Sequence, residues 1–388
     1  MSRFKSFKSY LYDKAYRPLM QLCISLFYYL PVNKRKIVLM HDFGNDYGDS
    51  PKYIAEELLK RNKGYKLVWI VNDMKMQIPK PIKKVYIARI RSVFELSTAK
   101  VFINTGKYRY NVKKKSSQFF IYVPHGQIGA KYVERQAGDN LGKSYQEGSV
   151  WHSSVSNLFI SSSKLFTEEM LTYYWYNGEV QETGLPRNDI FFHHTQEDIV
   201  RIKSKLGIST ETKIAFYAPT FRDSGDASAY QIDMSRLHQT LEKKTGGKWL
   251  ILVRLHPNFI WFEKPAFEYG EKIKDVTSYP DIQELLVVSN ILITDYSSTM
   301  FDFYLMKRPV FLFTKDIPEY KKMRGLKDWF FKVPFPFCHD NDELNEAVNH
   351  FNNDEYELKC IEFDKIYGSL ESGNSTQALV NRIEAEMQ

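Results

Sequence analysis

The chain has 388 residues, of which 43% are hydrophobic, 15% aromatic and 26% charged. This apolar content excludes an intrinsically disordered protein, and the 19 Gly and 15 Pro, which follow no period, exclude a fibrous one. The 54 Lys and Arg against 46 Asp and Glu give a net charge of +8, which favours an anionic partner such as nucleic acid, an acidic lipid surface or a phosphorylated substrate. Three cysteines without a CxxC motif argue against a disulfide framework and a structural zinc site, and fit a reducing compartment.

Residues 1–35 form a basic, aromatic segment that stands apart from the rest of the chain. Its basic residues are Arg3, Lys5, Lys8, Lys14 and Arg17, interleaved with Phe4, Phe7, Tyr10 and Leu11, and an apolar run follows at 19–30. This run is shorter than the roughly 20 residues that a helix needs to cross a bilayer, and it lacks the small-residue cleavage site of a signal peptide. We predict an amphipathic helix that lies on an anionic membrane surface. The alternative is a helix packed on the protein's own core.

Beyond residue 36, short β-branched or aromatic runs alternate with helical patterns, which is typical of βαβ units and parallel sheets. The expected strands are residues 36–43, 66–73, 84–89, 100–106, 119–126, 157–163 and 179–184, and then 213–221, 249–257, 291–298 and 309–314. The expected helices are residues 51–61, 91–99 and 164–175, and then 198–207, 235–244, 282–290, 300–308 and 342–351. The series restarts after a polar stretch near 193–198. We therefore predict two facing Rossmann-like domains at 36–195 and 196–388, with the last helix packing back on the first domain.

Ligands of open parallel sheets bind beyond the carboxyl ends of the strands, so the polar residues there are candidate site residues. They are Asn104 and Thr105; His125 and Gly126; Thr220, Arg222 and Asp223; Arg254, His256 and Asn258; and Asp295, Ser297, Ser298 and Thr299. The chain has neither GxGxxG nor a Walker motif, which argues against nicotinamide and P-loop chemistry. HExxH is also missing, and the adjacent His193 and His194 lack a third ligand at metal spacing, so we predict no metal site.

The segment 291–303 predicts a phosphate site. Ser297, Ser298 and Thr299 stand between a strand and a helix, where hydroxyls and the free amides of the first helical turn together attract an anion. Ordinary helix capping is the alternative. Arg254 and His256 are two apart on an extended chain and project to the same side, which would suit a diphosphate. For His256, a histidine satisfied within the core is the other interpretation.

His125 precedes a glycine in the sequence VPHGQIGAKY. A glycine there leaves the imidazole on an accessible turn, where it can take a proton from a hydroxyl nucleophile near neutral pH. A solvated loop histidine is the simpler interpretation. The polar cluster expected from the other domain favours the catalytic one.

Several stretches together resemble one family over nearly the whole chain. They are DSPKYIAEELL (49–59), KLVWIVND (66–73), PHG (124–126), ETGLPRND (182–189), FYAPTFRD (216–223), VRLHPN (253–258), residues 278–303 and MRG (323–325). In this order they resemble the CDP-glycerol:poly(glycerophosphate) glycerophosphotransferase family of teichoic-acid-type polymer synthesis. The resemblance implies a GT-B-like fold, a CDP-activated alditol as donor and a polyprenyl-diphosphate-linked glycan as acceptor.

The resemblance also assigns expected roles to individual residues. His125 matches the catalytic base, and we group His256 with it as catalytic. Arg254, His256, Ser297 and Ser298 match donor-phosphate contacts, and Arg187, Asn188, Arg222 and Asp223 match further cleft positions. To these we add Thr299 as a donor-diphosphate contact and Gly126, Asn258, Asp295 and Arg324 as cleft positions. We expect no tightly bound cofactor. The need for a divalent metal is left open.

The chain departs from the family pattern directly after His125. The family commonly continues with Thr-Pro-Leu-Lys, whereas this chain has HGQIGAK, with Gln127 in place of a hydroxyl side chain and Lys131 near the usual lysine. A CDP-ribitol-dependent ribitol-phosphate transferase therefore stays open beside the glycerol-phosphate enzyme. Within 388 residues we expect no tandem transferase domain, which suits a primase and a polymerase equally well.

The expected reaction is in-line phosphoryl transfer: an acceptor hydroxyl loses its proton to His125 and attacks the β-phosphorus of CDP-glycerol, and CMP leaves. The expected location is the cytoplasmic face of the cell membrane, as a peripheral protein of cell-wall or capsular polysaccharide biosynthesis. A GT-B glycosyltransferase using a nucleotide sugar is the alternative enzyme. A basic membrane- or RNA-binding adaptor is the non-enzymatic alternative, and the clustered strand-end residues disfavour it, so no nucleic-acid partner is expected.

Overall fold

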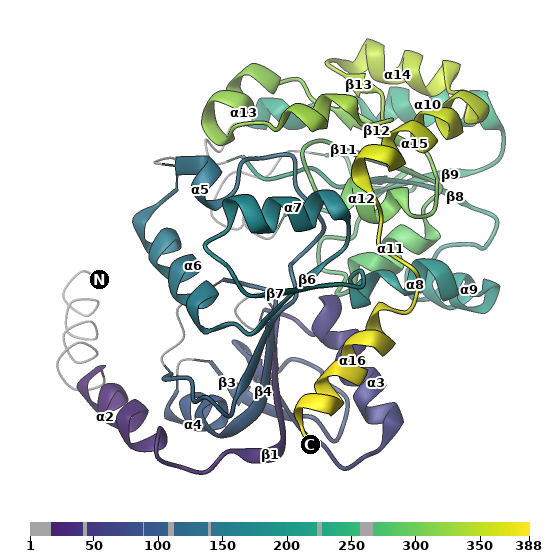
Figure 1. Cartoon of the computed structure of the whole chain (residues 1–388). Helices are drawn as coiled ribbons and strands as arrows, with labels where there is room; N and C mark the ends of the chain where they lie inside the picture. Colours follow the sequence, from purple (N-terminus) through teal and green to yellow (C-terminus); the bar gives the residue numbers. More distant parts are fainter. Residues whose placement is uncertain are drawn as a thin grey trace, which may run out of the picture.

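The strands of the chain form two separate parallel sheets (Figure 1). The computed structural model describes residues 17–41, 45–87, 89–107, 112–138, 141–222, 227–256 and 267–388. Within these ranges one sheet has seven strands and the other six, and every paired strand runs parallel to its neighbour. The two sheets predicted from the alternating pattern are confirmed. We call the elements from α2 to α8 the first half and those from α9 to α15 the second half.

The first sheet has the strand order β3-β2-β1-β4-β5-β6-β7. Its strands are β1 (Asn33–Met40), β2 (Lys66–Val71), β3 (Lys83–Tyr86), β4 (Ala99–Asn104), β5 (Phe119–Tyr122), β6 (Leu158–Ser161) and β7 (Glu179–Glu182). All seven were predicted from the sequence, with ends that differ by a few residues. The order reverses direction between β1 and β4, which is the switch point where doubly wound sheets bind ligands.

Helices cover both faces of the first sheet because alternate residues of its strands are apolar on both sides. On one face, α3 (Asp49–Arg61) packs with alternate residues of β1 and β2, such as Ile37 and Trp69. On the other face, α4 (Ile90–Thr98) packs with Val38 and Val68. The remaining helical elements of this half are α5 (Glu134–Ala137), α6 (Lys143–Val155), α7 (Lys164–Tyr173), η4 (Pro186–Asn188) and α8 (Ile190–His193).

The second sheet repeats the same topology in the order β10-β9-β8-β11-β12-β13. Its strands are β8 (Lys213–Tyr217), β9 (Trp249–Val253), β10 (Ile273–Asp275), β11 (Ile291–Thr294), β12 (Val310–Phe313) and β13 (Phe337–Cys338). The short edge strands β10 and β13 were not predicted, because two or three residues carry no detectable period. The switch point of this sheet lies between β8 and β11.

The helices of the second half again cover both sheet faces. Two of them, α10 and α14, pack on the face that carries Tyr217 and Ile251, while α9, α11, α12 and α15 share a cluster with Phe216 and Leu252 on the other face. Their bounds are α9 (Gln196–Lys205), η5 (Ala227–Tyr230), α10 (Met234–Thr245), α11 (Ile282–Val288), α12 (Thr299–Tyr304), α13 (Ile317–Arg324), η7 (Asp328–Lys332), α14 (Asn341–His350) and α15 (Asn353–Tyr367). Helix α12 ends four residues earlier than the sequence pattern predicts.

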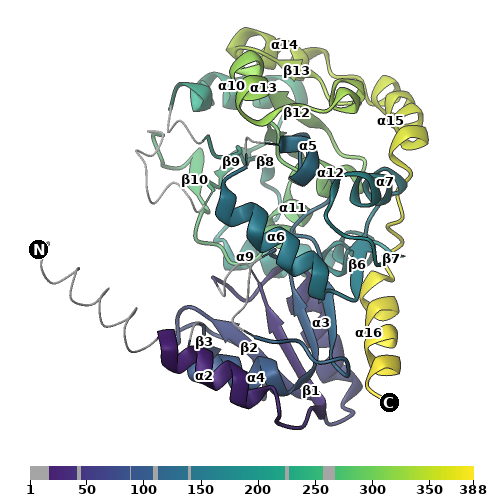
Figure 2. The same cartoon turned by 60° about the vertical axis from the view of Figure 1, so that its left-hand side comes forward.

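The C-terminal helix α16 (Ser375–Glu386) returns to the first half, where Figures 1 and 2 show it beside α3. Its buried residues Leu379, Val380 and Ile383 belong to the cluster that contains Ile37 and Trp69 of the first sheet. The chain therefore crosses twice between the halves, before β8 and after α15. The predicted boundary between 195 and 196 falls at the N-terminus of α9, where Thr195 caps the helix, and stays a prediction.

Helix α2 (Arg17–Phe27) lies at the edge of the first half, beside α4 (Figure 2). Met20 and Ile24 are buried against Val93, and the Phe27 and Phe94 rings meet edge to face at 5.6 Å. On the opposite side Leu19, Leu22 and Leu26 are 46%, 56% and 57% exposed. One side of this helix packs on the protein, as one alternative predicts, and the other presents leucines to solvent. Contact with a membrane stays a prediction.

The part of the N-terminal segment that carries most of its basic residues lies outside the described residues. This part includes Arg3, Lys5, Lys8 and Lys14 and the apolar Phe4, Phe7, Tyr10 and Leu11. Among the described residues, none of the helices combines the length and the apolar character needed to span a bilayer.

Candidate active site

Polar side chains follow three adjacent strands of the first sheet, at the edge that meets the second half. His41 follows β1, Thr105 follows β4 and His125 follows β5 by three residues. His41 Nδ1 lies 3.0 Å from Thr105 Oγ1, and the His41 and His125 ring centroids are 5.1 Å apart. The switch point between β1 and β4 thus brings two imidazoles together, as parallel-sheet geometry requires.

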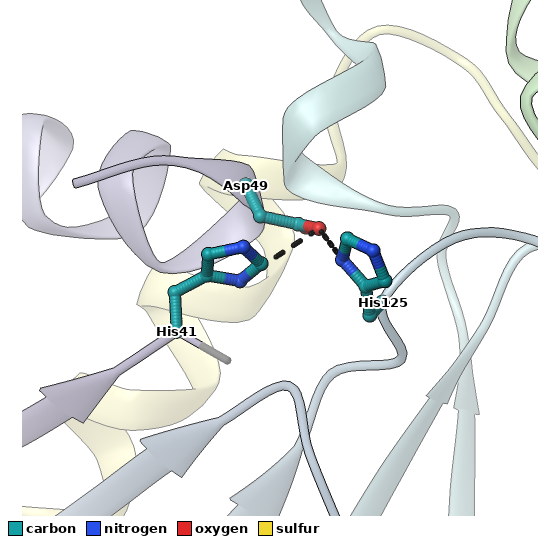
Figure 3. Close-up of side chains that lie close together, drawn as sticks. All are labelled: His41, Asp49 and His125. Atoms are coloured by element: carbon teal, nitrogen blue, oxygen red, sulfur yellow. Dashed lines mark hydrogen bonds and ion pairs between the residues drawn. The ribbon is translucent and has the colours of Figure 1, made fainter. Parts of the chain in front are cut away.

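Asp49, the first residue of α3, anchors His125 (Figure 3). Its Oδ2 lies 2.7 Å from His125 Nδ1 and 3.9 Å from His41 Nδ1. The Asp49 side chain is only 3% exposed, whereas that of His125 is 61% exposed. The imidazole is therefore held at one ring edge by a buried carboxylate while most of its surface stays accessible.

Arg187 of η4 connects this carboxylate to the second half. Its NH1 donates to Asp49 Oδ2 at 2.9 Å, and its NH2 donates to Asp302 of α12. All three side chains are almost fully buried. Burial would raise the pKa of Asp49, but Arg187, His125 and His41 together lower that pKa well below its ordinary value. Burial raises the pKa of Asp302 despite the opposing charge of Arg187.

The loop after His125 also contacts the second half. Gly126 has φ of +97°, and a Cβ atom at this position would lie 2.5 Å from Ser298 Oγ. Only glycine allows both this backbone conformation and this close approach. The next residue, Gln127, is buried and donates through Nε2 to Asp302 Oδ1 at 3.1 Å. The glutamine that departs from the family pattern thus supports the contact between the two halves.

The hydroxyls after β11 stand at the same junction. Ser297 Oγ donates to Thr299 Oγ1 at 3.0 Å and accepts from the Thr299 amide at 3.3 Å. Ser298 is the N-cap residue of α12, but its hydroxyl makes no capping hydrogen bond. The capping alternative thus applies to Ser297, which accepts from the first amide of α12, and not to Ser298. The phosphate site stays a prediction.

Arg254 and His256 follow β9 in the neighbouring position of the second sheet. The residue between them, Leu255, is buried, while neither Arg254 nor His256 is. Arg254 is half-buried and donates through NH1 to the carbonyl of Tyr279, and burial lowers the pKa of its guanidinium. His256 is exposed, with its ring centroid 6.2 Å from that of Phe221, so it is not a core histidine.

Arg222 and Asp295, two predicted cleft residues, form a buried ion pair instead. Arg222 donates to Asp295 Oδ2 at 2.8 Å and to Asp316 Oδ2 at 2.6 Å, and its guanidinium lies within 5.5 Å of the Tyr230 and Tyr296 ring centroids. Burial lowers the pKa of this guanidinium, but Asp295 and Asp316 raise it above its ordinary value. With 2% of its side chain exposed, Arg222 supports the loops after β8 and β11.

Other predicted positions lie beside the junction or outside the described residues. Arg324 is the last residue of α13, and its carbonyl accepts from the Tyr132 amide at 3.3 Å. Lys131 is exposed. Asp223 and Asn258, both predicted as cleft residues, lie outside the described residues.

Asn188 is buried and holds the segment that leads to α16. Its Nδ2 donates to Glu371 Oε1 at 2.7 Å, and the Leu185 amide donates to the same carboxyl group at 3.1 Å. Burial raises the pKa of Glu371 to about 8. Asn188 therefore acts within the first half, through its contact with the returning chain.

Sequence analysis did not identify His41, Asp49 or Asp302 as site residues. His41 lay inside the strand predicted at 36–43, whereas the observed β1 ends at Met40, so its place after the strand became visible only in the structure. Asp49 and Asp302 lie in helices, where a single acidic residue has no distinctive pattern, and only the fold shows what they contact.

Among the described residues, one group could hold a metal ion: His41, Asp49 and His125, whose ligand atoms lie within 4.8 Å of one another. Two imidazoles and a carboxylate would suit a transition metal. The Arg187 guanidinium, however, already occupies Asp49 Oδ2. A fixed positive charge at that oxygen disfavours a cation.

Comparison with known proteins decides the family. Residues 22–385 match the model of the family described as CDP-Glycerol:Poly(glycerophosphate) glycerophosphotransferase. The chain belongs to this family.

Two curated relatives of the chain are polymerases of different alditol phosphates. The chain is 31% identical over 395 residues to the teichoic acid poly(glycerol phosphate) polymerase of Bacillus subtilis strain 168, in an alignment that covers 96% of this chain and 51% of the relative. It is 24% identical to the teichoic acid poly(ribitol-phosphate) polymerase of Bacillus spizizenii, covering 94% of this chain and 58% of the relative. The chain thus spans about half the length of these relatives.

Solved structures confirm the GT-B-like fold. The wall teichoic acid polymerase TagF superposes with a TM-score of 0.83 at 26% identity, covering 100% of this chain and 98% of the TagF chain. The UDP-GlcNAc 2-epimerase of Neisseria meningitidis, at 11% identity and a TM-score of 0.54 over 90% of this chain and all of its own, shares the fold alone.

Glu371→Gln should change how stability depends on pH. In the folded protein Glu371 keeps its proton up to a pH of about 8, whereas an unfolded glutamate loses it near pH 4.3. Between these values the folded state binds one proton more, so the wild type loses stability as pH rises. The glutamine side chain of the variant is neutral at every pH. We expect the melting temperature of the variant, relative to wild type, to rise between pH 5 and pH 9, measured by scanning fluorimetry.

The matched control for this experiment is Glu357→Gln, which changes an exposed glutamate of α15. It should reproduce the wild-type pH dependence. Parallel melting curves for Glu371→Gln and wild type across this range would contradict a protonated Glu371.

Proposed function

We propose that this protein transfers glycerol phosphate from CDP-glycerol to a lipid-linked acceptor in teichoic-acid-type polymer synthesis and releases CMP. Family membership and the glycerol-phosphate polymerase of Bacillus subtilis support the reaction class, and a TagF variant has been solved after soaking with CDPG. One structural observation carries the proposal: Gly126, next to His125, approaches Ser298 of the other half so closely that a side chain would not fit. A candidate base and a candidate phosphate contact thus meet at one junction.

His125 is the general base in this mechanism. The acceptor hydroxyl gives its proton to His125 while its oxygen forms a bond to the β-phosphorus of the donor. The bond from that phosphorus to the bridging oxygen breaks, and CMP leaves with the electron pair. Phosphoryl transfer of this kind depends mainly on positioning and on stabilisation of charge.

The donor diphosphate lies, in this proposal, against the second half. Arg254 supplies a guanidinium, His256 an exposed imidazole and Ser297, Ser298 and Thr299 a set of hydroxyls next to the first turn of α12. These groups follow β9 and β11, on the two sides of β8 in the sheet order. Charge-assisted hydrogen bonds from such groups stabilise the charge that develops on CMP.

A ribitol-phosphate transferase is the second candidate. The poly(ribitol-phosphate) polymerase of Bacillus spizizenii aligns over 94% of this chain, nearly as much as the glycerol-phosphate relative does. The two donors share the cytidine diphosphate and differ only in the alditol. The groups proposed to bind the diphosphate therefore do not distinguish between them.

A donor screen tests the function. Purified protein is given CDP-glycerol, CDP-ribitol, UDP-sugars or CMP-sugars with a polyprenyl-diphosphate-linked glycan acceptor, and released CMP, CDP and UDP are measured. We expect CMP release with CDP-glycerol at a rate at least tenfold above that with CDP-ribitol. A reversed preference would establish the ribitol enzyme. Turnover of a nucleotide sugar alone would overturn the proposal in favour of a glycosyltransferase.

His125→Ala should reduce kcat by about 10²–10⁴-fold, the effect expected for the loss of a general base. The side chain is largely exposed, so the melting temperature and the affinity for CDP-glycerol in calorimetry should change little. Lys131→Ala, which changes an exposed residue of the same loop, controls for disturbance of that loop. Near-wild-type turnover of His125→Ala would remove the base assignment.

We further propose that the protein binds the cytoplasmic face of the membrane peripherally, because a polyprenyl-linked acceptor cannot leave the bilayer. The exposed leucines of α2 support this proposal: Leu19, Leu22 and Leu26 share one side of a helix whose other side is already packed on α4. The basic residues that precede α2 in sequence add attraction to anionic lipids.

Replacing Leu19, Leu22 and Leu26 together by Gln should reduce binding to anionic liposomes at least tenfold in a sedimentation assay, because the change removes apolar area available to the interface. Stability should change little, since all three residues are about half exposed. Leu358 and Ile361 of α15, which are also exposed, serve as the control when both are changed to Gln. Unchanged sedimentation of the α2 variant would place membrane binding elsewhere.

A further inference from the structure

We propose that Asp49 is a positioning residue for the transfer reaction and acts through His125. The inference rests on the proposed function, in which His125 is the base. Asp49 is the first residue of α3 and lies 76 residues before His125 in the chain. Its Oδ2 accepts a hydrogen bond from His125 Nδ1 at 2.7 Å. Figure 3 shows the carboxylate between the two imidazoles, directed toward His125.

The hydrogen bond at Nδ1 determines which nitrogen acts as the base. A neutral imidazole carries its proton on one nitrogen and a lone pair on the other. An ionised carboxylate accepts hydrogen bonds and cannot donate, so the His125 proton must reside on Nδ1. The lone pair is then on Nε2, and the acceptor hydroxyl is deprotonated there. When Nε2 takes that proton, the adjacent carboxylate stabilises the imidazolium.

Two features of the structure keep the carboxylate ionised, and a third indicates that surrounding contacts hold Asp49 in place. Arg187 donates to the same Oδ2 atom from a buried position. Asp49 also stands at the N-terminus of a 13-residue helix, where a negative charge is stabilised. Its φ of +54° lies in the left-handed region, which non-glycine residues seldom adopt and which is found at sites where surrounding contacts enforce it.

A metal ion is the alternative role for the same three side chains, since His41 lies close enough to complete a set of ligands. The observations favour positioning. Asp49 Oδ2 already accepts from Arg187 and from His125, and His41 Nδ1 lies 3.0 Å from Thr105 Oγ1. An ion at Asp49 Oδ2 would have to displace a buried guanidinium.

A double-mutant cycle in the full chain tests the proposal. Asp49→Asn suits the backbone, because asparagine tolerates a positive φ as well as aspartate does. With CDP-glycerol as donor we expect this variant to lose about 10²–10³-fold in kcat, with KM for the donor changed less than threefold. When the same change is introduced into His125→Ala, kcat should fall by less than a further threefold, because the base through which Asp49 acts is already absent.

The pH profile of kcat distinguishes a positioning role from a purely structural one, because loss of a residue that only supports the fold would leave the profile unchanged. His125 contacts the carboxylate of Asp49 and the imidazole of His41, and the guanidinium of Arg187 lies at the same Asp49 oxygen. Of these only Asp49 favours the protonated imidazole. Its loss should therefore shift the acid limb of the profile to lower pH. An unshifted limb would overturn the proposal.

Glu95→Gln is the matched control for the loss of a buried, paired carboxylate. Glu95 is 2% exposed and pairs with Lys36 at 2.7 Å in the first half, on α4. This variant should lose stability while kcat and the pH profile stay at wild-type values. If Asp49→Asn behaved in the same way, or cost equally much in the wild-type and His125→Ala backgrounds, Asp49 would be structural and the proposal would fail.

A measurement on the wild-type protein keeps the test independent of folding of the variants. ¹⁵N-labelled histidine NMR, with His125→Ala used for assignment, reports the tautomer of each imidazole. We expect the Nδ1-protonated form for His125, and the Nε2-protonated form would overturn the proposal. A kcat that rises on adding Zn²⁺ or Mn²⁺ to chelator-treated protein, with the response lost in Asp49→Asn, would establish the metal role instead. Full turnover of His125→Ala, or turnover with another donor alone, would overturn the proposed function. The tautomer measured in the wild-type protein would still show whether Asp49 accepts from His125 Nδ1.

Discussion

The buried guanidinium of Arg187 is the contact on which the junction between the two halves depends. It stands between Asp49 of the first half and Asp302 of the second, and all three side chains are nearly inaccessible to water. Without Arg187, each carboxylate would be a buried charge without a partner. Removing one partner of a buried ion pair typically destabilises a protein by about 3–5 kcal/mol. The two halves are thus held in one relative arrangement by a charge that both share. The same arrangement places His125 next to Ser298.

The topology explains why the polar residues gather where they do. Each sheet reverses its strand order once, between β1 and β4 and between β8 and β11, and chain segments diverge to opposite faces at such points. His41 and Thr105 flank the first switch point, and Thr220 and Asp295 flank the second. The Thr220 amide donates to Asp295 Oδ1 at 2.9 Å. Asp295 and Arg222 therefore stabilise the loops at the second switch point. The hydroxyls at 297–299 come directly after these loops in the sequence.

The sequence was sufficient to predict the elements that have a strong period and the residues that follow them. Eleven strands and the positions of His125, Arg254 and Ser298 follow from alternation and from strand-end chemistry. The place of Arg222 in the cleft stays a prediction. The sequence did not indicate that Arg222 is buried, because its three aromatic neighbours come from positions 230, 296 and 320. Asp49 and Asp302 were missed for the same reason. Their partners are distant in sequence, and a pattern read along the chain records only neighbours.

Gln127 shows how a departure from a family pattern can preserve an arrangement. The carbonyl and the amide of a glutamine reach farther than the hydroxyl commonly found after His-Gly, and here Nε2 reaches Asp302 Oδ1. Gln283 donates to the other oxygen of the same carboxylate at 3.3 Å. Asp302 thus receives hydrogen bonds from amides of both halves in addition to Arg187. The hydrogen bond from Gln127 lowers the pKa of Asp302 and opposes the effect of burial. The residue after His-Gly therefore contributes to the charge balance that keeps Arg187, and through it Asp49 and His125, in place.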